Sequence, residues 1–343
     1  MKARKGLTLV AGGAGFIGSH LCRTLLDAGE QVICLDNLQT ARSSNLLDLE
    51  RHDGFTFVEA DITQPLPREI MRQAKAFTRI YNLACAASPE LYQMDPEHTM
   101  LTSVVGTVQL LRLAEQSGAR FLLTSTSEVY GDPEVHPQPE SYRGNVSCTG
   151  PRACYDEGKR AAETLAFDFA RAGRAEVRVA RIFNTYGPQM RLEDGRVVSN
   201  LICQTLSGEP LTIYGDGSQT RSFCYVADTV DGLRRLMESE AMDLQPVNIG
   251  NQQEITINEL AETLADMRGE RLEIVHRKLP VDDPQRRRPD ITRARTILGW
   301  EPTTPLRQGL ELTLAWFASE LQARNAAALA AAAPQPRMVV GGN

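Results

Sequence analysis

The fold is decided by one stretch near the start of the chain, Leu7-Thr8-Leu9-Val10-Ala11-Gly12-Gly13-Ala14-Gly15-Phe16-Ile17-Gly18-Ser19-His20-Leu21. An apolar strand runs here into the pattern G-x-x-G-x-x-G, and an apolar-periodic helix follows. Glycines at these positions let the backbone approach a pyrophosphate at the helix N-terminus, where unpaired N–H groups and the helix dipole favour anions. The stretch therefore predicts a strand and helix that bind a dinucleotide.

The next two strands supply carboxylates at the positions that such a site requires. The strand 31–35 ends in Asp36, at the spacing expected of the group that hydrogen-bonds the adenosine ribose. Asp36 would also repel a 2'-phosphate, which favours NAD over NADP, although Arg42 could soften that preference if it is more than a solvated loop residue. After the strand 55–60, Asp61 and Ile62 are expected to border the adenine, unless Asp61 only caps a turn.

Strands and helices alternate along the first half of the chain, which is typical of a doubly wound parallel sheet. The expected strands are 7–11, 31–35, 55–60, 79–84, 120–125 and 176–182, and the expected helices are 16–28, 97–117 and 153–172. We expect an α/β Rossmann-type domain at 1–187, with 222–252 returning to it, a smaller C-terminal substrate-binding lobe at 188–320, and a disordered tail at 321–343. Because the helix 97–117 is apolar over more than one face, we also expect a homodimer.

Composition restricts the function. The chain has 343 residues and a net charge of −6, which argues against binding to nucleic acid or to a membrane surface. We find neither a signal-peptide core nor a window of ~20 apolar residues. Seven cysteines without C-x-x-C spacing and five histidines without a ligand pattern predict a reduced, cytoplasmic protein with no metal site.

The stretch Cys154-Tyr155-Asp156-Glu157-Gly158-Lys159-Arg160 places a phenol and an ammonium one helical turn apart. A lysine beside a tyrosine favours the tyrosinate, so we expect the pKa of Tyr155 to fall from ~10 toward neutrality. Such a group could take a proton from a sugar hydroxyl. The competing interpretation is an exposed tyrosine and lysine with no shared role.

Hydroxyl side chains end the strand that precedes this helix, in Thr124-Ser125-Thr126-Ser127-Glu128-Val129-Tyr130-Gly131-Asp132-Pro133. The carboxyl ends of parallel strands are where ligands bind in an open sheet, so this cluster is expected to face the nicotinamide. Thr126 could hydrogen-bond both the substrate hydroxyl and Tyr155. Serine and threonine at a strand end can also be simple turn caps.

With these residues the chain resembles the extended short-chain dehydrogenase/reductase superfamily and, within it, the UDP-glucuronate decarboxylases, also called UDP-xylose synthases. The resemblance covers about residues 7–317. Beyond the motifs already quoted, it is carried by Ala84 with Ala87-Ser88-Pro89, Ala180-Arg181-Ile182-Phe183-Asn184-Thr185-Tyr186-Gly187-Pro188, Asp194-Gly195-Arg196-Val197-Val198-Ser199-Asn200, Gln219-Thr220-Arg221-Ser222-Phe223, and Asp282-Asp283-Pro284 with Arg287 and Pro289-Asp290.

The resemblance implies an activity and a set of site residues. Tyr155 would remove the C4 hydroxyl proton while NAD+ accepts hydride, the 4-keto sugar would lose CO2, and return of the hydride would give UDP-xylose. The residues implied to be catalytic are Thr126, Glu128, Tyr155, Lys159 and Arg287. Those expected at NAD are Gly12, Gly15, Phe16, Ile17, Gly18, Asp36, Asn37, Thr40, Asp61, Ile62, Leu83, Ala84, Thr102, Tyr155, Lys159 and Thr185. Those expected at UDP-glucuronate are Ser88, Tyr92, Asn184, Val198, Thr212, Tyr214, Arg221 and Arg287.

The arginines and Glu128 carry the charge expected at the substrate. A guanidinium pairs an anion bidentately, which suits Arg221 and Arg287, although the run 286–288 also resembles a solvated surface cluster. Glu128, close to the substrate carboxylate, is expected to have a raised pKa or to act through water. The sequence departs from the family pattern at Ala86, Glu90, Arg143, 147–149 and Gln189, which leaves the exact sugar or product open.

Three alternatives remain. A nucleotide-sugar 4,6-dehydratase would place an Asp-Glu pair after the threonine, where this chain has Ser127-Glu128. A UDP-glucuronate 4-epimerase needs the same oxidation, but must let the keto sugar turn over before CO2 is lost. An NAD-binding sensor or scaffold would be indicated by loss of Thr126, Tyr155 or Lys159, and all three are present.

Overall fold

The computed structural model describes residues 6–240, 243–269, 272–278 and 286–332. Its centre is a seven-stranded parallel sheet in the order β11-β6-β5-β4-β1-β2-β3. The strands are β1 (Leu7–Ala11), β2 (Gln31–Asp36), β3 (Phe55–Glu59), β4 (Phe77–Asn82), β5 (Arg120–Thr126), β6 (Val177–Ile182) and β11 (Val247–Ile249). The order reverses beside β1, which is the crevice where such sheets bind ligands. The predicted Rossmann-type fold class is confirmed.

Helices cover both faces of the sheet, because successive side chains of a strand point to opposite faces. Val10 packs in the core shared with α1 (Phe16–Asp27), α8 (Val226–Glu238) and α10 (Thr292–Leu298). The neighbouring Leu9 packs in the opposite core, with α5 (Thr107–Ser117) and α6 (Ala153–Arg171). The smaller helices along this domain are α2 (Arg68–Arg72), α3 (Pro89–Met94), α4 (Pro96–Leu101), η1 (Ser43–Asn45), η2 (Ala74–Ala76) and η4 (Ser127–Tyr130).

The helix predicted at 97–117 is interrupted. Between α4 and α5 the chain forms one π-helical segment, η3 (Thr102–Gly106). Gly106 is needed there, because a Cβ atom would collide with the Ile62 side chain. Single π-turns inside helices often occur at functional sites, and this one packs against Ile62, which follows β3.

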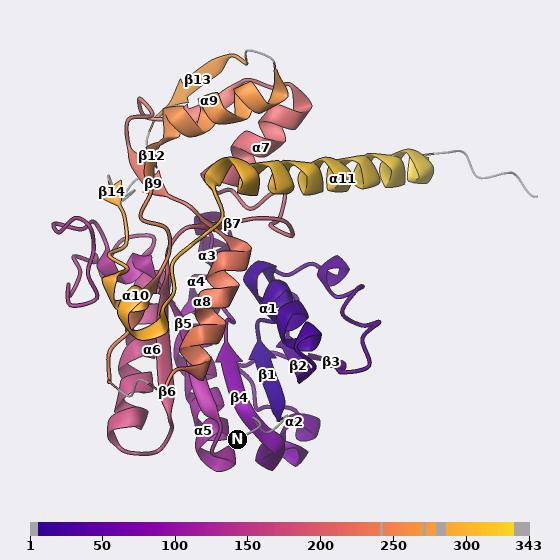
Figure 1. Ribbon diagram of the computed structural model, residues 1–343. Coiled ribbons are helices and arrows are strands. Elements are labelled where there is room, and N and C mark those ends of the chain that lie inside the picture. The colour runs from indigo at the N-terminus through magenta and orange to yellow at the C-terminus, as the bar shows by residue number, and fades with distance from the viewer. Residues whose placement is uncertain (1–5, 241–242, 270–271, 279–285, 333–343) are drawn as a thin grey trace, which may run out of the picture.

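The smaller lobe lies above the carboxyl ends of the strands in Figure 1. Its helices are α7 (Val197–Ser207), α9 (Ile257–Arg268) and α11 (Leu306–Ala332), which share a core around Leu201, Leu260 and Phe317. Its strands are short: β8 (Leu211–Tyr214) pairs with β13 (Ile274–Arg277), and β9 (Thr220–Ser222) lies between β12 (Glu254–Thr256) and β14 (Arg286–Arg287). β7 (Thr185–Tyr186) pairs with β10 (Cys224–Tyr225) between the lobe and the sheet.

The prediction of a disordered tail at 321–343 is wrong for residues 321–332, which continue α11 away from the body of the molecule (Figure 1). Alanine has the highest helix propensity, so the Ala-rich composition favours continuation of the helix. Residues 333–343 lie outside the described part of the chain. In that described part, no helix is both long and apolar enough to cross a membrane.

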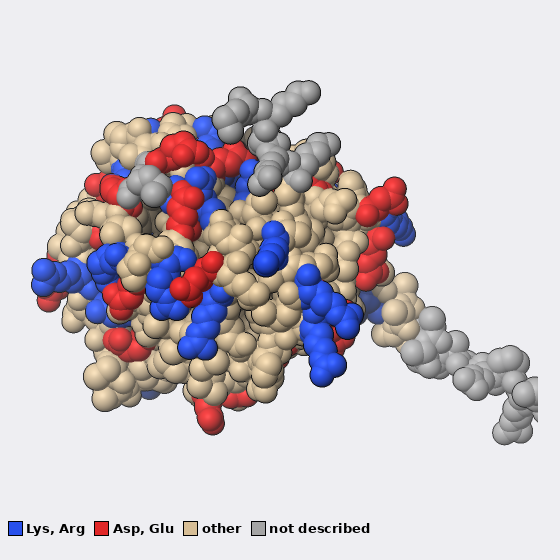
Figure 2. Space-filling view, turned by 90° about the horizontal axis from the view of Figure 1, so that it is seen from below, with Lys and Arg blue, Asp and Glu red and all other residues tan. Residues whose placement is uncertain are grey.

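Charged side chains of both signs are interspersed on the face turned toward the viewer in Figure 2. That face lies below the sheet in the view of Figure 1, on the side away from the smaller lobe.

Candidate active site

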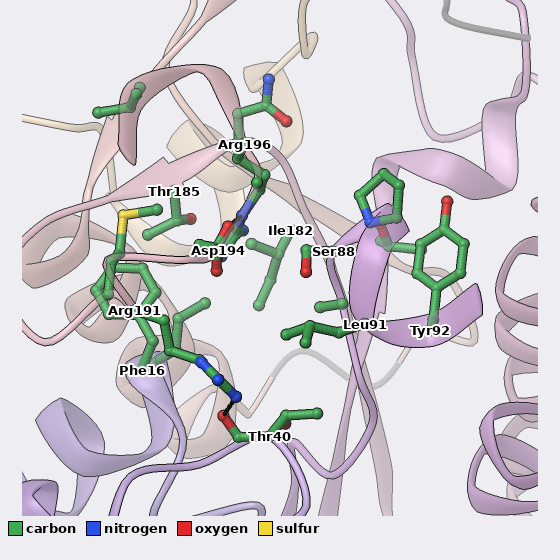
Figure 3. A pocket seen from close by; sticks show the side chains of 18 of the residues that line it. Phe16, Thr40, Ser88, Leu91, Tyr92, Ile182, Thr185, Arg191, Asp194 and Arg196 are labelled. Carbon is green, nitrogen blue, oxygen red and sulfur yellow. Dashed lines mark hydrogen bonds and ion pairs between the residues drawn. The ribbon is translucent and has the colours of Figure 1, made fainter. Parts of the chain in front are cut away.

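The cleft between the sheet and the smaller lobe is a cavity of about 560 Å³ that continues into a smaller one of about 70 Å³ beside β2 and β3. The two share Gly12, Gly15, Thr40, Leu83 and Cys85 in their walls. Figure 3 shows the larger cavity, with Asp194 and Arg196 side by side and with Leu91 and Tyr92 entering from α3. Every residue predicted at NAD, at the sugar nucleotide or in catalysis lines one or both cavities.

The glycine turn has the form that a dinucleotide pyrophosphate requires. Gly12 has φ of +78°, and a Cβ atom there would lie 2.6 Å from the Ala84 nitrogen. A Cβ atom on Gly18 would collide with the Gly12 carbonyl oxygen. Helix α1 begins at Phe16 directly after this turn, so its first-turn N–H groups meet the cavity. Only glycine allows this close packing of the turn, which leaves its main chain at the cavity wall, so the residues present fit the dinucleotide.

The ribose end of the site is fixed by main-chain hydrogen bonds. The Asp36 carboxylate accepts the N–H of Ala14 at 3.0 Å and that of Leu38 at 2.9 Å. Burial raises the pKa of Asp36, while the N–H groups of Leu38 and Ala14 act in the opposite direction. A carboxylate has four lone-pair sites, so the Asp36 oxygens can still accept hydrogen bonds from ribose hydroxyls. Arg42 does not lie free beside this carboxylate, because it pairs with Glu320 of α11.

The adenine end is organised by Asp61, which the sequence singled out, and by His98, which it did not. His98 Nε2 lies 2.7 Å from the Asp61 carboxylate, and Asn37 Nδ2 donates to the same carboxylate at 3.4 Å. Burial alone would raise the pKa of Asp61, but the hydrogen bonds from His98 and Thr63 lower it. His98 is brought here from α4, and Thr102, in the π-helical segment, lines the same small cavity.

Tyr155 and Lys159 lie on the face of α6 that meets the end of β5, and both are buried. Lys159 Nζ donates to the Thr124 carbonyl oxygen at 3.0 Å and lies 5.9 Å from the centre of the Tyr155 ring. The Tyr155 ring stacks on Tyr92, with 5.0 Å between ring centres. The predicted phenol and ammonium therefore meet Thr126 at one point of the cavity wall.

The prediction that the pKa of Tyr155 falls toward neutrality is wrong for this arrangement. Burial raises the pKa of Tyr155, and the hydrogen bond with Thr126 opposes this shift without reversing it. Burial also lowers the pKa of Lys159. Desolvation disfavours both charged forms, and at this depth it outweighs the attraction between tyrosinate and ammonium. The phenol therefore keeps its proton until substrate and a cationic cofactor change its surroundings.

Glu128 is held by two arginines. Arg287 contacts both carboxylate oxygens, with Nη2 at 2.9 Å from Oε2, and Arg152 Nη2 lies 3.2 Å from Oε2. Burial by itself would raise the pKa of Glu128, but the charges of Arg287 and Arg152 hold it below the ordinary value. A raised pKa, one of the two possibilities expected for Glu128, is therefore wrong, because the sequence did not show that Arg152 and Arg287 meet this carboxylate. Action through water remains a prediction. Glu128 is ionised in the cleft.

The run 286–288 is not a uniform solvated cluster. Arg286 is exposed, whereas Arg287 is buried and faces Glu128. Arg221, on the neighbouring strand β9, is also buried and lines the cavity. These guanidinium groups outnumber the carboxylate beside them, which suits a ligand that carries phosphate and carboxylate groups.

Sequence reasoning missed further charged residues in the cavity wall, among them Arg152, Asp194 and Arg196. Arg152 precedes α6 by one residue, and Arg196 pairs with buried Asp194 at the start of α7, with 2.8 Å between Nη2 and Oδ2. The stretch around Asp194 and Arg196 had been noted only as part of the resemblance. The one available signal was its run of charged residues inside an otherwise loop-rich segment. In the described residues, no group of three or more His, Cys, Asp or Glu is placed to hold a metal ion.

The comparisons with known proteins agree with this geometry. Residues 8–250 match the model of the NAD dependent epimerase/dehydratase family. UDP-glucuronic acid decarboxylase 5 of Arabidopsis thaliana is 53% identical over 305 residues, which cover 89% of this chain and 87% of that protein. UDP-glucuronic acid decarboxylase 1 of Danio rerio is 50% identical over 321 residues, covering 94% and 74%.

Among solved structures, UDP-glucose 4-epimerase of Thermotoga maritima matches with a TM-score of 0.83 at 31% identity, covering 92% of this chain and 99% of that one. UDP-glucuronic acid 4-epimerase of Bacillus cereus, in complex with UDP-glucuronic acid and NAD, matches with a TM-score of 0.82 at 28% identity and the same coverage. These structures share the fold, whereas the decarboxylases named above are identical to this chain at more positions. The chain thus belongs to the NAD dependent epimerase/dehydratase family and, within it, to the UDP-glucuronic acid decarboxylases.

Proposed function

We propose that the protein is an NAD-dependent UDP-glucuronate decarboxylase that forms UDP-xylose through a UDP-4-keto sugar. The observation that carries the proposal is the cluster of Glu128, Arg287 and Arg152 in the same cavity as Tyr155 and Lys159. One half of the cavity is equipped for oxidation at a sugar hydroxyl and the other for a ligand with a carboxylate. The identity to UDP-glucuronic acid decarboxylases supports that assignment.

NAD would be held by the glycine turn, Asp36, and the residues around Asp61, and when bound it supplies the hydride acceptor and donor for C4 and a positive charge in the cleft. Tyr155 takes the C4 hydroxyl proton, with Thr126 bonded to the same oxygen. Lys159 holds a fixed position beside Tyr155 and Thr126, because its ammonium donates a hydrogen bond to the Thr124 carbonyl oxygen. The electrostatic cost of the tyrosinate is offset by the ammonium and by Arg196, whose charge also reaches Tyr155.

Loss of CO2 follows from the chemistry of the oxidised sugar. Once C4 is a ketone, the C6 carboxylate is a β-keto acid, and the electron pair of the C5–C6 bond moves into an enolate. The proton from Tyr155 returns to the C4 oxygen when C4 is reduced, so the new C5 hydrogen requires a second proton and each turnover consumes one from solvent. Glu128 is ionised, so it has no proton to give to C5. Its charge instead competes with the substrate carboxylate for Arg287 and Arg152. This competition keeps the two arginines from holding the substrate carboxylate too tightly, and the carboxylate must lose that contact before it leaves as CO2.

The remaining predictions are also proposals. Residues 1–187 with 222–252 would form the NAD-binding domain, which pairing of β11 with β6 supports, and 188–320 the sugar-nucleotide lobe. A homodimer through α4, η3, α5 and α6 is supported by partly exposed apolar side chains along these segments, including Leu101, Val105 and Leu165. A cytoplasmic location is supported by seven free cysteines, since a reducing compartment keeps thiols in this state.

A UDP-glucuronate 4-epimerase is the second candidate, because solved epimerases share the fold and one binds UDP-glucuronic acid and NAD. Incubation of the protein with NAD and UDP-glucuronate separates the two, with product masses read by mass spectrometry. A decarboxylase gives a UDP-pentose and an equal amount of CO2. A product with the mass of the substrate would establish epimerisation and contradict the proposal.

A further inference from the structure

The segment that carries Arg287 is held in place by a glutamine from the other side of the cleft. Gln138 lies in the loop that follows η4, and its side chain is fully buried. Its main-chain N–H donates to the Arg288 carbonyl oxygen at 2.9 Å, and its carbonyl oxygen accepts the Asp290 N–H at 3.0 Å. Its side-chain Oε1 accepts the Arg288 N–H at 2.8 Å, while Nε2 donates to the Val135 carbonyl oxygen at 2.7 Å.

The Arg288 N–H belongs to the peptide group directly after Arg287. Gln138 Oε1 therefore binds the main chain at the point where the Arg287 side chain departs. On its other side, Arg287 pairs with Arg221 of β9, and its carbonyl oxygen accepts the Ser222 hydroxyl at 3.4 Å. Two fixed neighbours thus set the direction in which the guanidinium meets Glu128.

The same glutamine is connected to the catalytic strand by buried polar groups. Asn248 Nδ2 donates to the Gln138 carbonyl oxygen at 2.9 Å, and Asn248 Oδ1 accepts the Tyr130 hydroxyl at 2.8 Å. Arg181 joins Tyr130 to Glu163, and Glu163 accepts the hydroxyl of Ser125, the neighbour of Thr126. A fully satisfied buried network of this kind is rigid. It joins the end of β5 to the segment 288–290.

We propose that Gln138 is a positioning residue for Arg287, and that it acts on the substrate only through that guanidinium. The inference rests on the proposed function, because it assigns Arg287 to the substrate carboxylate. β14 is only two residues long, so pairing with β9 alone leaves one side of the strand unsupported. Gln138 supplies the second side and joins it to the domain that holds Tyr155.

The test is a double-mutant cycle with Gln138→Met, which keeps the length of the side chain and removes both polar atoms. We expect kcat/KM for UDP-glucuronate to fall between ~10- and ~100-fold, because displacement of a reacting contact by about 1 Å has effects of this size. In an Arg287→Lys background, Gln138→Met should lower kcat/KM by less than about threefold, because the guanidinium through which Gln138 acts is already absent. Gln138→Glu, which keeps an acceptor for the Arg288 N–H, should recover part of the activity.

Asp228→Ala is the matched control. Asp228 is also buried and accepts the main-chain N–H groups of Thr303 and Thr304, at 3.2 and 3.0 Å, away from Arg287. It should lower thermal stability and leave kcat/KM within about twofold. If Gln138→Met does not fold, Gln138→Asn, which retains the amide on a shorter side chain, takes its place in the cycle.

An equal loss in the wild-type and Arg287→Lys backgrounds, or activity of Gln138→Met within twofold of wild type, overturns the inference. The proposed function is tested separately on the wild-type protein. If that protein releases no CO2 from UDP-glucuronate, the proposed function is overturned. The cycle is then read on the dissociation constant of UDP-glucuronate, where coupling between Gln138 and Arg287 supports the inference and additivity overturns it.

Discussion

The cofactor half and the substrate half of the cleft are built differently. In the cofactor half, two buried charged side chains bind main-chain groups: Asp36 accepts the N–H groups of Ala14 and Leu38, and Lys159 donates to the Thr124 carbonyl oxygen. In the substrate half, charged side chains bind each other, as Glu128 does with Arg287 and Arg152. The main chain at and beside the strand ends is held by the sheet, whereas ion pairs can exchange partners. The first half is therefore preformed, and the second can admit a charged sugar nucleotide by exchange of counter-charges.

The largest effect is expected where the two halves meet. Tyr155→Phe should lower kcat by ~10²-fold or more, because it removes the oxygen that accepts the C4 proton. NAD affinity, measured by calorimetry, should stay within about twofold, because the glycine turn and Asp36 are untouched. Tyr81→Phe, which alters a buried tyrosine of β4 outside both cavities, is the control. Turnover of Tyr155→Phe within tenfold of wild type would assign the base to another group.

The next effect isolates the substrate half. Arg287→Ala should lower kcat/KM by ~10²-fold, because it removes one partner of a buried, charge-assisted contact and leaves Glu128 to Arg152 alone. Arg286→Ala changes the exposed neighbour on the same strand and should have an effect of less than about twofold. Steady-state kinetics of both variants tests the difference. Equal small losses would mean that the run 286–288 is a solvated cluster.

A smaller effect isolates the cofactor half. Asp36→Ala should weaken NAD binding roughly tenfold, because it removes the acceptor for ribose hydroxyls, and it should narrow the preference over NADP. The exposed carboxylate of Asp48 provides the control variant, Asp48→Ala. Titration of each protein with both cofactors measures the two constants. If the preference for NAD is unchanged, the discrimination lies in another residue.

The smallest effect concerns stability. Burial, and then the charge of Glu128, raises the pKa of Asp156 to about 7, from about 3.9 in the unfolded chain. Between these values the folded protein holds a proton that the unfolded chain has lost, so Asp156 makes stability fall as pH rises from ~4 to ~7. Asp156→Asn should remove this contribution and raise the melting temperature relative to wild type at pH ~8. An unaltered pH profile in Asp156→Asn would show that this carboxyl titrates normally.

The two halves also differ in how far the sequence predicts them. The glycine turn, Asp36 and the helix with Tyr155 and Lys159 are local patterns in elements whose neighbours follow from alternation of strands and helices. Arg287 reaches Glu128 across 159 positions, and nothing local connects them. Without that contact, a raised pKa was one of the two possibilities expected for Glu128, and the arginines lower it instead. For Tyr155, the pKa was predicted in the wrong direction because the sequence does not show how deeply the phenol is buried. Residue spacing shows which groups meet, but not how much of their hydration they lose.

Arg152, Asp194, Arg196 and Gln138 were missed for a similar reason. Each is an ordinary polar residue beside a turn, and its role depends on a partner from another element. Gln138 is the extreme case, because its significance lies in the main chain of residues 288–290, which no side-chain pattern encodes.

The most direct test follows the hydrogen at C4. UDP-glucuronate deuterated at C4 is incubated with the protein and NAD in ordinary water, and unlabelled substrate is incubated in heavy water. We expect a UDP-pentose that retains deuterium at C4 in the first case and gains one solvent deuterium at C5 in the second, because C4 is oxidised and reduced around loss of CO2. A product that retains the carboxylate, or a UDP-pentose without the C4 label, would contradict decarboxylation with return of the hydride.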